Sequence, residues 1–380
     1  MKILLCTNSF ENVVNGPAKF ANLILEINQL YPQHQIHILT EDITAERPYV
    51  HKAELRFSRL FKPFSQFLRM FVYHRYAQKI YKTFPYDVLV YNNAFIGLWS
   101  AMVSKQPVVG MVNDDNNLTV SWQNFKFNQL SIKQLIFKQF EKLAVHFDQL
   151  VISNSHYLTQ QLINAYYLNP EKICLLYKAV DLSKIEYKAE RSFALPIKIL
   201  FVKADYVRGG LPVLAKSLKK LNHIQFLLTI IGPHHKFEKH IYTLFENNSH
   251  IKINFLAEQS QKNVYEQMCT HDIFCVPSLK EALGVANIEA LAFGIPVVST
   301  YTGGIPEVLD NGKNGWLANS NDAEDLAIQL SSCISNEPER NQKSANGRKF
   351  IEKFAANTMF LTFINIAENA CKPVTRYTSR

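Results

Sequence analysis

The chain has 380 residues, enough for two domains of ordinary size, and its 47% hydrophobic and 19% charged residues are typical of a folded globular protein. No apolar run approaches the roughly 20 residues of a membrane helix, and the opening MKILLCTNSF turns polar too early for a signal peptide. The six cysteines form no C-x-x-C pair, which argues against a zinc cage or disulfide framework and favours reduced thiols in a cytoplasmic protein.

Short apolar runs alternate with helical patterns along the whole chain. The expected strands of the first half are 2–6, 35–39, 87–91, 107–112 and 149–153, and a helix is expected over 17–28 behind Gly16. Those of the second half are 197–202, 226–231, 251–256, 272–276 and 296–300, followed by a C-terminal helix over about 341–370. Because the runs are uniformly apolar, they predict strands buried on both faces of a parallel sheet. The alternation predicts an α/β, doubly wound architecture.

The strand–helix pattern occurs twice, on either side of a polar joint at 182–196. We therefore expect an N-terminal Rossmann-like domain over 1–185 and a second Rossmann-like domain over 186–350. A C-terminal helix over 351–380 would return toward the N-domain. Open α/β sheets bind ligands outside the carboxyl ends of their strands, so two such domains facing across a cleft would hold their ligands there.

The net charge of +9 is concentrated in one segment. Residues 51–82 hold eight lysines and arginines but a single acid, Glu54, so this segment carries a charge of +7. Such a segment attracts a phosphate-rich partner: a membrane surface, a nucleic acid or a phosphorylated substrate. Nucleic acid is disfavoured as a partner, because no recognition helix or stacking platform accompanies the charge.

A helix is expected to begin at Pro63 within this segment. Its apolar stripe would consist of Phe64, Leu68, Phe71 and Val72. In one interpretation the helix packs on the N-domain and its basic end is simply solvated. In the other, the segment contacts an anionic bilayer surface, into which aromatic side chains such as Phe67 would dip. The residues assigned to membrane or acceptor contact are Arg59, Lys62, Arg69, Arg75 and Lys79.

The most informative stretch is 277–309, PSLKEALGVANIEALAFGIPVVSTYTGGIPEVL. Glu281 lies in the loop after the strand 272–276, Gly284 opens a helix, and Glu289 lies in the second turn of that helix. The free N–H groups at the helix start would bind an anion such as phosphate, and the helix dipole favours it. Carboxylates accept hydrogen bonds from hydroxyl groups, which sugars present. The loop 301–304 is expected to close over the same site.

Two pairs of acidic residues also have an ordinary structural explanation. Alone, two glutamates beside a helix are usually solvated carboxylates, and only the surrounding glycines and strands favour a site. Asp114 and Asp115 form a second candidate, a metal-binding pair, but adjacent loop aspartates are more often turn residues.

The stretch EALGVANIEALAFGIPVVST, followed by GGIPEVL and NGWL, resembles family 4 of the retaining glycosyltransferases, the group 1 glycosyl transferases, which have the GT-B fold. Weaker similarities follow in the family's order: NGPAKFANLI (15–24), SNSHYL (153–158), AVDL (179–182) and ILFVKADYVRGGLPVL (199–214). Together they span most of the chain. The resemblance implies two doubly wound domains facing across a cleft, with the acceptor on the first and a nucleotide sugar on the second.

The resemblance also implies roles for individual residues. Glu289 would bind the ribose hydroxyls of the nucleotide, and Glu281 would bind hydroxyls of the donor sugar. The residues assigned to donor binding are Glu289, Leu283, Gly284, Val285, Gly16 and Asn113, with the N–H groups around Leu283–Val285 holding the diphosphate. Asn113 stands where the family often has a histidine, so no histidine base is assigned.

A second departure concerns the charges that neutralise the leaving diphosphate. The family uses an arginine and a lysine in the first loop of the second domain, usually without a metal. Here Lys203–Ala204 and Gly209–Gly210 stand in their places, so Lys203 and Arg208 are the substitutes. The residues assigned to catalysis are Glu281, Arg208 and Lys203.

We expect a retaining glycosyltransferase, of the hexosyltransferase class, that moves a sugar from a nucleotide-diphosphate sugar to a hydroxyl acceptor. The acceptor would be a lipid-linked or cell-envelope glycan, with the protein in the cytoplasm or peripheral on the inner face of the membrane. No metal or other cofactor is expected. Two alternatives stay open: a sugar-nucleotide epimerase on the same fold, which needs no second substrate, and a non-catalytic, membrane-associated relative.

Overall fold

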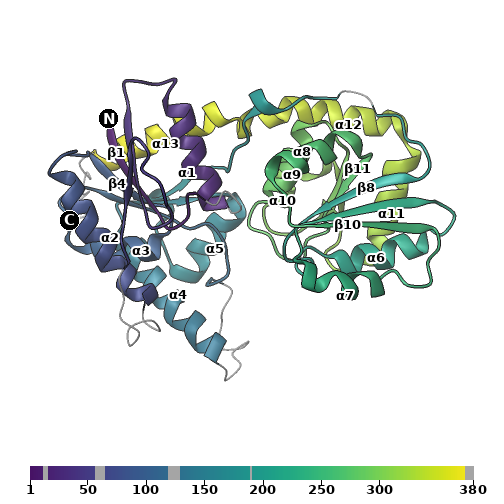
Figure 1. Ribbon diagram of the computed structural model, residues 1–380, viewed down its shortest axis with the longest axis horizontal. Coiled ribbons are helices and arrows are strands. Elements are labelled where there is room, and N and C mark those ends of the chain that lie inside the picture. Colours follow the sequence, from purple (N-terminus) through teal and green to yellow (C-terminus); the bar gives the residue numbers. More distant parts are fainter. Residues whose placement is uncertain (12–15, 56–64, 119–128, 189–190, 373–380) are drawn as a thin grey trace, which may run out of the picture. The chain divides into compact units, whose positions relative to one another are not determined.

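The computed structural model describes residues 1–11, 16–55, 65–118, 129–188 and 191–372. The chain forms two compact units, shown in Figure 1. The first consists of Met1–Lys178 together with Ala356–Arg380, and the second of Ala179–Ala355. The sequence places the corresponding boundaries at 185 and 350.

The first unit is built on a seven-stranded parallel sheet. In spatial order its strands are β3 (Val50–Lys52), β2 (Gln35–Thr40), β1 (Lys2–Thr7), β4 (Val88–Tyr91), β5 (Val108–Met111), β6 (Leu150–Ser153) and β7 (Ile173–Leu175). The first six follow the order 3-2-1-4-5-6 of a Rossmann fold. The topological switch point therefore lies between β1 and β4, where the strand order reverses.

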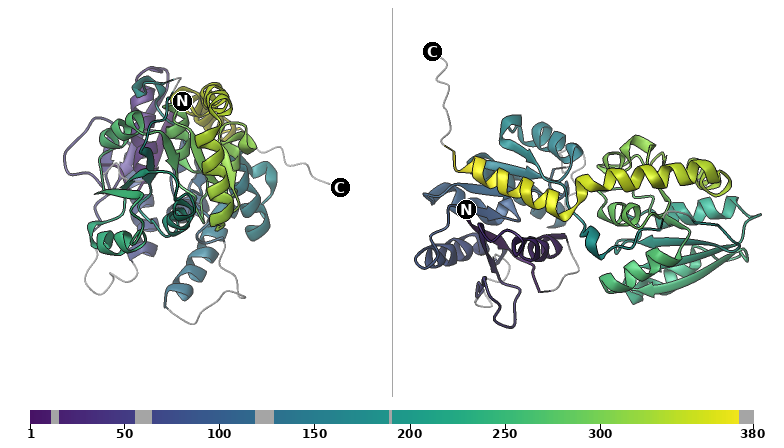
Figure 2. Two further views of the ribbon diagram at one scale, coloured as in Figure 1. Left: turned by 90° about the vertical axis from the view of Figure 1, so that its right-hand side faces the viewer. Right: turned by 90° about the horizontal axis from the view of Figure 1, so that it is seen from above.

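Helices cover both faces of this sheet (Figure 1). They are α1 (Gly16–Asn28), α2 (Ser65–Tyr81), α3 (Ala94–Val103), α4 (Gln129–Phe147), α5 (His156–Tyr166) and α13 (Ala356–Ala370). Helix α3 packs between α2 and α4, whereas α13 lies against α1 (Figure 2). The ring centroids of Phe20 and Phe363 are 5.8 Å apart, and Tyr31 stacks on Phe360 at 4.9 Å. The end of the chain thus completes the first unit.

The second unit repeats the same strand order in a six-stranded parallel sheet. Its strands, in spatial order, are β10 (Ile251–Ala257), β9 (Phe226–Ile231), β8 (Ile197–Val202), β11 (Ile273–Cys275), β12 (Val297–Thr300) and β13 (Trp316–Ala318). Its helices are α6 (Leu211–Lys220), α7 (Glu238–Thr243), α8 (Gln261–Thr270), α9 (Val285–Ala292), α10 (Ile305–Val308), α11 (Ala323–Ser335) and α12 (Glu337–Phe350). Here the switch point lies between β8 and β11, which are paired neighbours.

Two expectations about helices are wrong. The single helix expected over 341–370 is interrupted: α12 ends at Phe350, and Ile351–Phe354 form a 3-10 turn before α13. The turn persists because Ile351 and Phe354 are fully buried and the N–H of Val180 donates to the carbonyl of Phe354 at 2.9 Å. In α2 the buried stripe consists of Met70, Tyr73, Ala77 and Ile80, whereas Phe71 is exposed. Pro63 and Phe64, where this helix was expected to begin, lie outside the described ranges.

Among the helices in the described ranges, none combines the length and apolar character needed to cross a bilayer.

Candidate functional site

Gly284, expected to open a phosphate-binding helix, ends the loop that joins β11 to α9. Gly284 is the N-cap of α9, with φ 95° and ψ 56°, and no side chain caps this helix end. A Cβ atom at Gly284 would lie 2.8 Å from Nδ2 of Asn287 and 3.2 Å from Cγ1 of Ile305, so only glycine fits. The first turn of an α-helix has N–H groups without intrahelical acceptors, and their dipoles favour an anion. The start of α9 therefore offers donors to a phosphate group.

Glu281 and Lys203 meet at the switch point of the second sheet. Lys203 directly follows β8, Glu281 lies in the loop after β11, and Nζ of Lys203 donates to Oε2 of Glu281. The two side chains are 28% and 20% exposed, so the pair is open to solvent on one side. A cation and a carboxylate side by side can bind a phosphate group and a hydroxyl group of the same ligand.

Arg208 lies on the neighbouring loop between β8 and α6. Its side chain is 56% exposed, and its Nε lies 3.5 Å from Oδ2 of Asp205. Its carbonyl accepts a hydrogen bond of 2.7 Å from the N–H of Leu279, which ties this loop to the loop that carries Glu281. The Arg208 guanidinium is thus a surface group on an anchored loop.

Glu289 is only 5% exposed. Its Oε1 accepts from Nε2 of Gln261 at 3.0 Å and from Oη of Tyr265 at 3.5 Å, both on α8. Burial, followed by the neighbouring charge of Glu289, raises the pKa of Tyr265. The sequence did not point to Gln261 or Tyr265, although both lie one helical turn apart on α8. A carboxylate has about four acceptor positions, so Glu289 can still accept from a hydroxyl group.

The loop 301–304 lies against the backbone of Glu281. Gly303 has φ 55°, and a Cβ atom there would lie 1.6 Å from the carbonyl oxygen of Glu281. Oγ1 of Thr300 donates to the carbonyl of Ser278 at 2.7 Å, and Oγ of Ser299 donates to that of Val276 at 2.7 Å. The end of β12 therefore supports the Glu281 loop. Lys203, Glu281, Leu283, Gly284, Val285 and Glu289 all lie around this one edge of the second sheet.

Gly16 and Asn113 belong to the first unit. Gly16 is exposed at the start of α1, and no atom lies within 4 Å of a Cβ atom built there. Asn113 follows β5 and is one of three asparagines at the carboxyl ends of neighbouring strands. Nδ2 of Asn154 donates to the carbonyl of Asn113 at 2.8 Å, and Nδ2 of Asn113 donates to that of Asn92 at 2.6 Å.

This asparagine row, Asn92, Asn113 and Asn154, continues to the switch point of the first sheet. Nδ2 of Asn92 donates to Oγ1 of Thr7 at 3.4 Å and to the carbonyl of Pro17 at 3.1 Å, in the first turn of α1. Asn92 and Asn154 were missed in the sequence, although each follows an expected strand of the same sheet. The row supplies a neutral, hydrogen-bonding edge where Rossmann-like sheets bind their ligands.

A buried carboxyl group lies beneath the loop after β5. Glu141 of α4 accepts from Oη of Tyr166 at 2.7 Å and from Nδ2 of Asn117 at 2.9 Å. Burial raises the pKa of Glu141 to about 7, against the lowering effect of these two hydrogen bonds. Of the nearby aspartates, Asp114 accepts from the N–H of Asn116 as a turn residue does, whereas Asp115 is buried and accepts from Oη of Tyr157 on α5 at 2.9 Å.

The described part of the basic segment contains both paired and exposed cations. Arg69 donates from Nε to Glu41 at 2.9 Å, whereas Arg75 and Lys79 are exposed and line a surface cavity of about 540 Å³ with Lys82. Phe67, which one of the two interpretations places at a bilayer surface, stacks on Phe137 with ring centroids 5.3 Å apart, as the interpretation of a packed helix expects. Arg59 and Lys62 lie outside the described residues.

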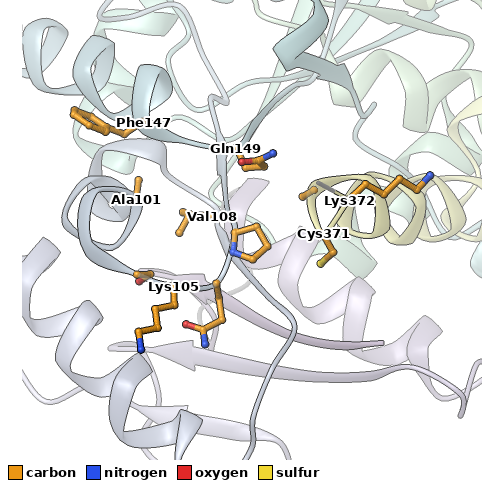
Figure 3. A pocket seen from close by; sticks show the side chains of 11 residues that line it. Ala101, Lys105, Val108, Phe147, Gln149, Cys371 and Lys372 are labelled. Atoms are coloured by element: carbon orange, nitrogen blue, oxygen red, sulfur yellow. The ribbon is translucent and has the colours of Figure 1, made fainter. Parts of the chain in front are cut away.

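Another cavity, of about 330 Å³, lies at the amino ends of β5 and β6, whereas the asparagine row lies at the carboxyl ends of the strands. Figure 3 shows four of the residues around it: Lys105 in the loop before β5, Val108 at the start of β5, Gln149 directly before β6 and Cys371 directly after α13. Because it adjoins the amino ends of the strands, it is not where α/β sheets usually bind ligands.

Two family models cover most of the chain. The model described as Glycosyltransferase Family 4 matches residues 26–184, and the model described as Glycosyl transferases group 1 matches residues 184–350.

Curated relatives mostly align over part of their length. The amylovoran biosynthesis glycosyltransferase AmsK of Erwinia amylovora is 31% identical over 169 residues, which cover 42% of this chain and 41% of AmsK. The WcaL protein of Salmonella typhimurium is 31% identical over 172 residues, 42% of either chain, so the chain spans about two fifths of these relatives. An uncharacterised protein from the cps region of Klebsiella pneumoniae is 23% identical over 94% of this chain and 97% of its own.

Solved structures share the whole fold. A glycosyltransferase from Rickettsia africae has a TM-score of 0.74 at 18% identity and covers 98% of both chains. HepE of Anabaena, in complex with UDP and glucose, has a TM-score of 0.70 at 18% identity and covers 97% of this chain and 99% of its own. Together with the two sheets, these likenesses confirm the predicted α/β fold of two doubly wound, Rossmann-like domains, the GT-B class.

Proposed function

Because the chain belongs to glycosyltransferase family 4, the group 1 glycosyl transferases, we propose that it is a retaining glycosyltransferase that uses a nucleotide-diphosphate sugar. The observation that carries this proposal is the meeting of Lys203 and Glu281 beside the uncapped start of α9. A diphosphate sugar needs donors for its phosphate oxygens and acceptors for its hydroxyl groups. At this edge of the second sheet, the start of α9 and Lys203 would supply the donors and Glu281 the acceptor. The UDP and glucose named for HepE support the same class of donor.

In the proposed reaction, the diphosphate lies at the start of α9, and Glu281 binds hydroxyl groups of the sugar. The acceptor oxygen bonds to the anomeric carbon on the face from which the diphosphate oxygen departs, and the hydroxyl proton leaves with the nucleotide diphosphate. The transition state resembles an oxocarbenium ion, and negative charge grows on the leaving group. Lys203 and Arg208 would stabilise that charge without a metal ion, because fixed charges aimed at it act most strongly there.

The acceptor we propose is a lipid-linked or cell-envelope glycan on the cytoplasmic side of an anionic membrane. The names of two relatives, one in amylovoran biosynthesis and one from a cps region, support a role in the biosynthesis of such glycans. The exposed cations of α2 support a phosphate-rich partner for the first unit.

Ligand binding and turnover with defined donors test the proposal. The purified chain is warmed with UDP-glucose, UDP-galactose, GDP-mannose or ADP-glucose, and a bound donor raises the melting temperature. The donor that binds is then incubated with the protein in EDTA, with water as the only acceptor, and ¹H NMR follows the sugar that is released. Retention predicts that the released sugar first has the anomeric configuration of the donor.

Each other outcome identifies a different function. Conversion of the donor into another nucleotide sugar would favour the epimerase. Binding of a donor without any turnover, whether water or membrane lipids are offered as the acceptor, would favour the non-catalytic relative. If none of the donors raises the melting temperature, the proposal is wrong.

A further inference from the structure

One asparagine in the first turn of α9 has no role in the reaction as described above. Asn287 is 3% exposed, and its Oδ1 is buried without a hydrogen-bond partner among the described residues. Apart from Glu289, which is hydrogen-bonded to α8, the other buried residues of this helix are apolar: Ile288, Ala290, Leu291 and Ala292. An unpaired amide in such surroundings lowers stability, whereas a leucine of similar volume would raise it.

The side chain of Asn287 points back at the start of its own helix. A Cβ atom at Gly284 would lie 2.8 Å from Nδ2 of Asn287 and 3.6 Å from Cγ of Glu281. The same point is 3.2 Å from Cγ1 of Ile305, on the segment that follows the loop 301–304. The Asn287 amide and the Glu281 side chain therefore approach Gly284 from two sides.

A second buried polar atom lies on the adjoining loop. Oγ1 of Thr302 also has no partner among the described residues, and the next residue, Gly303, lies against the carbonyl of Glu281. Helix α9 and the loop after β12 thus bring two unpaired polar atoms to the surroundings of Glu281. Buried polar groups are nearly always hydrogen-bonded, so each of these atoms would gain from a partner that a ligand supplies.

The chemistry of the amide selects between the parts of a diphosphate sugar. Oδ1 is an acceptor and needs a donor, but an ionised diphosphate offers only acceptors. Hydroxyl groups of the sugar are donors and lie beside Glu281 in the proposed reaction. We propose that Asn287 is a specificity-determining residue that accepts a hydrogen bond from a hydroxyl group of the donor sugar. This inference rests on the proposed function of the α9 site.

Asn287→Leu separates this role from a structural one. Melting temperature is measured without ligand, and calorimetry measures the affinity for UDP-glucose and UDP, and for GDP-mannose and GDP. We expect Asn287→Leu to melt at a higher temperature and to bind the nucleotide sugar about tenfold more weakly, while it binds the nucleotide diphosphate as the wild type does. A further test uses donor analogues that each lack one hydroxyl group of the sugar. The wild type should bind the analogue without the hydroxyl group that contacts Asn287 more weakly than the full donor, whereas Asn287→Leu should bind the two equally well.

Two further variants sharpen the comparison. Asn263 occupies the same third position of its own helix, α8, but is exposed, so Asn263→Leu should alter neither affinity. Asn287→Asp keeps an acceptor oxygen and adds a negative charge. It should therefore bind both the nucleotide sugar and the nucleotide diphosphate more weakly, while the ratio of the two affinities stays that of the wild type.

Every outcome decides a question. If the wild type binds no nucleotide sugar, the proposed function fails, and Asn287→Leu still reports on stability. If the wild type binds but Asn287→Leu keeps the full affinity for the sugar, the inference is wrong. A lower melting temperature with equal losses for both ligands would make Asn287 a structural residue and would also overturn it.

Discussion

Lys203 and Glu281 form an ion pair between the ends of two neighbouring strands, β8 and β11. These strands flank the switch point of the second sheet, where the strand order reverses. The pair is therefore a direct consequence of topology, since residues more than 70 positions apart in the chain follow adjacent parallel strands. The two charges of this pair neutralise each other, and a phosphate group would compete for Lys203.

Lys203→Ala should lower turnover strongly. We expect kcat to fall about 10²- to 10³-fold, because the charge on the leaving diphosphate loses a fixed partner. Lys220 of α6 is a suitable control, since it is also ion-paired, with Glu324, but at the exposed surface. Steady-state kinetics of donor consumption measures both variants. Equal turnover of Lys203→Ala and Lys220→Ala would remove Lys203 from the mechanism.

Glu289→Ala should weaken nucleotide binding by about tenfold, because hydrogen bonds from hydroxyls to a charged group contribute roughly 1.5–3 kcal/mol. The carboxylate is already held by Gln261 at 3.0 Å, so Gln261→Ala tests whether that contact orients it. We expect Gln261→Ala to have a smaller effect than Glu289→Ala, measured by calorimetry with the nucleoside diphosphate. The opposite order would mean that Glu289 is held for the fold of α8 and α9 rather than for the ligand.

The long apolar strands could be predicted from the sequence, because strands buried on both faces need continuous apolar runs. The missed strands β3, β7 and β13 have only three residues each, and in β3 and β7 no residue is fully buried. Such short runs carry no period of their own, and they form because neighbouring strands offer unpaired backbone groups.

The geometry of the candidate site could be predicted where its residues are close in sequence. Gly284 and Glu289 share one loop and helix, so their spacing fixes their geometry. In α2, by contrast, the sequence shows an apolar period but not which apolar residues face inward, and Phe71 is exposed while Tyr73 is buried. The partners of Glu289 on α8 and the burial of Asn287 depend on packing between helices, which no spacing in the chain encodes.

The exposed cations at the end of α2, Arg75 and Lys79, together with Lys82 directly after it, should bind anionic vesicles. Each basic residue near an anionic surface contributes about 1 kcal/mol, so the triple variant Arg75→Ala, Lys79→Ala, Lys82→Ala should bind about 100-fold more weakly at low salt. The control replaces three exposed lysines of the second unit, Lys216, Lys252 and Lys262, by alanine. Sedimentation with phosphatidylserine vesicles at increasing salt measures both. Equal losses in the two triple variants would show that only the overall charge matters.

Glu141 should make the stability of the first unit depend on pH. Burial raises its pKa from 4.5 to about 7, so between these values the folded protein holds a proton that the unfolded chain has lost. The contribution of this group to the free energy of unfolding is therefore fully present below pH 4.5 and is lost as the pH rises through about 7, by about 3 kcal/mol in total.

Glu141→Gln keeps the side-chain shape but cannot titrate, so its difference from the wild type should change with pH in that window. We expect the free energy of unfolding of Glu141→Gln, measured with urea, to rise relative to that of the wild type from pH 5 to pH 8, because the wild type must then carry a buried charge. Glu171, which is exposed, provides the control Glu171→Gln. A difference between Glu141→Gln and the wild type that stays constant over this range would mean that the Glu141 carboxyl ionises in the folded protein as readily as in the unfolded chain.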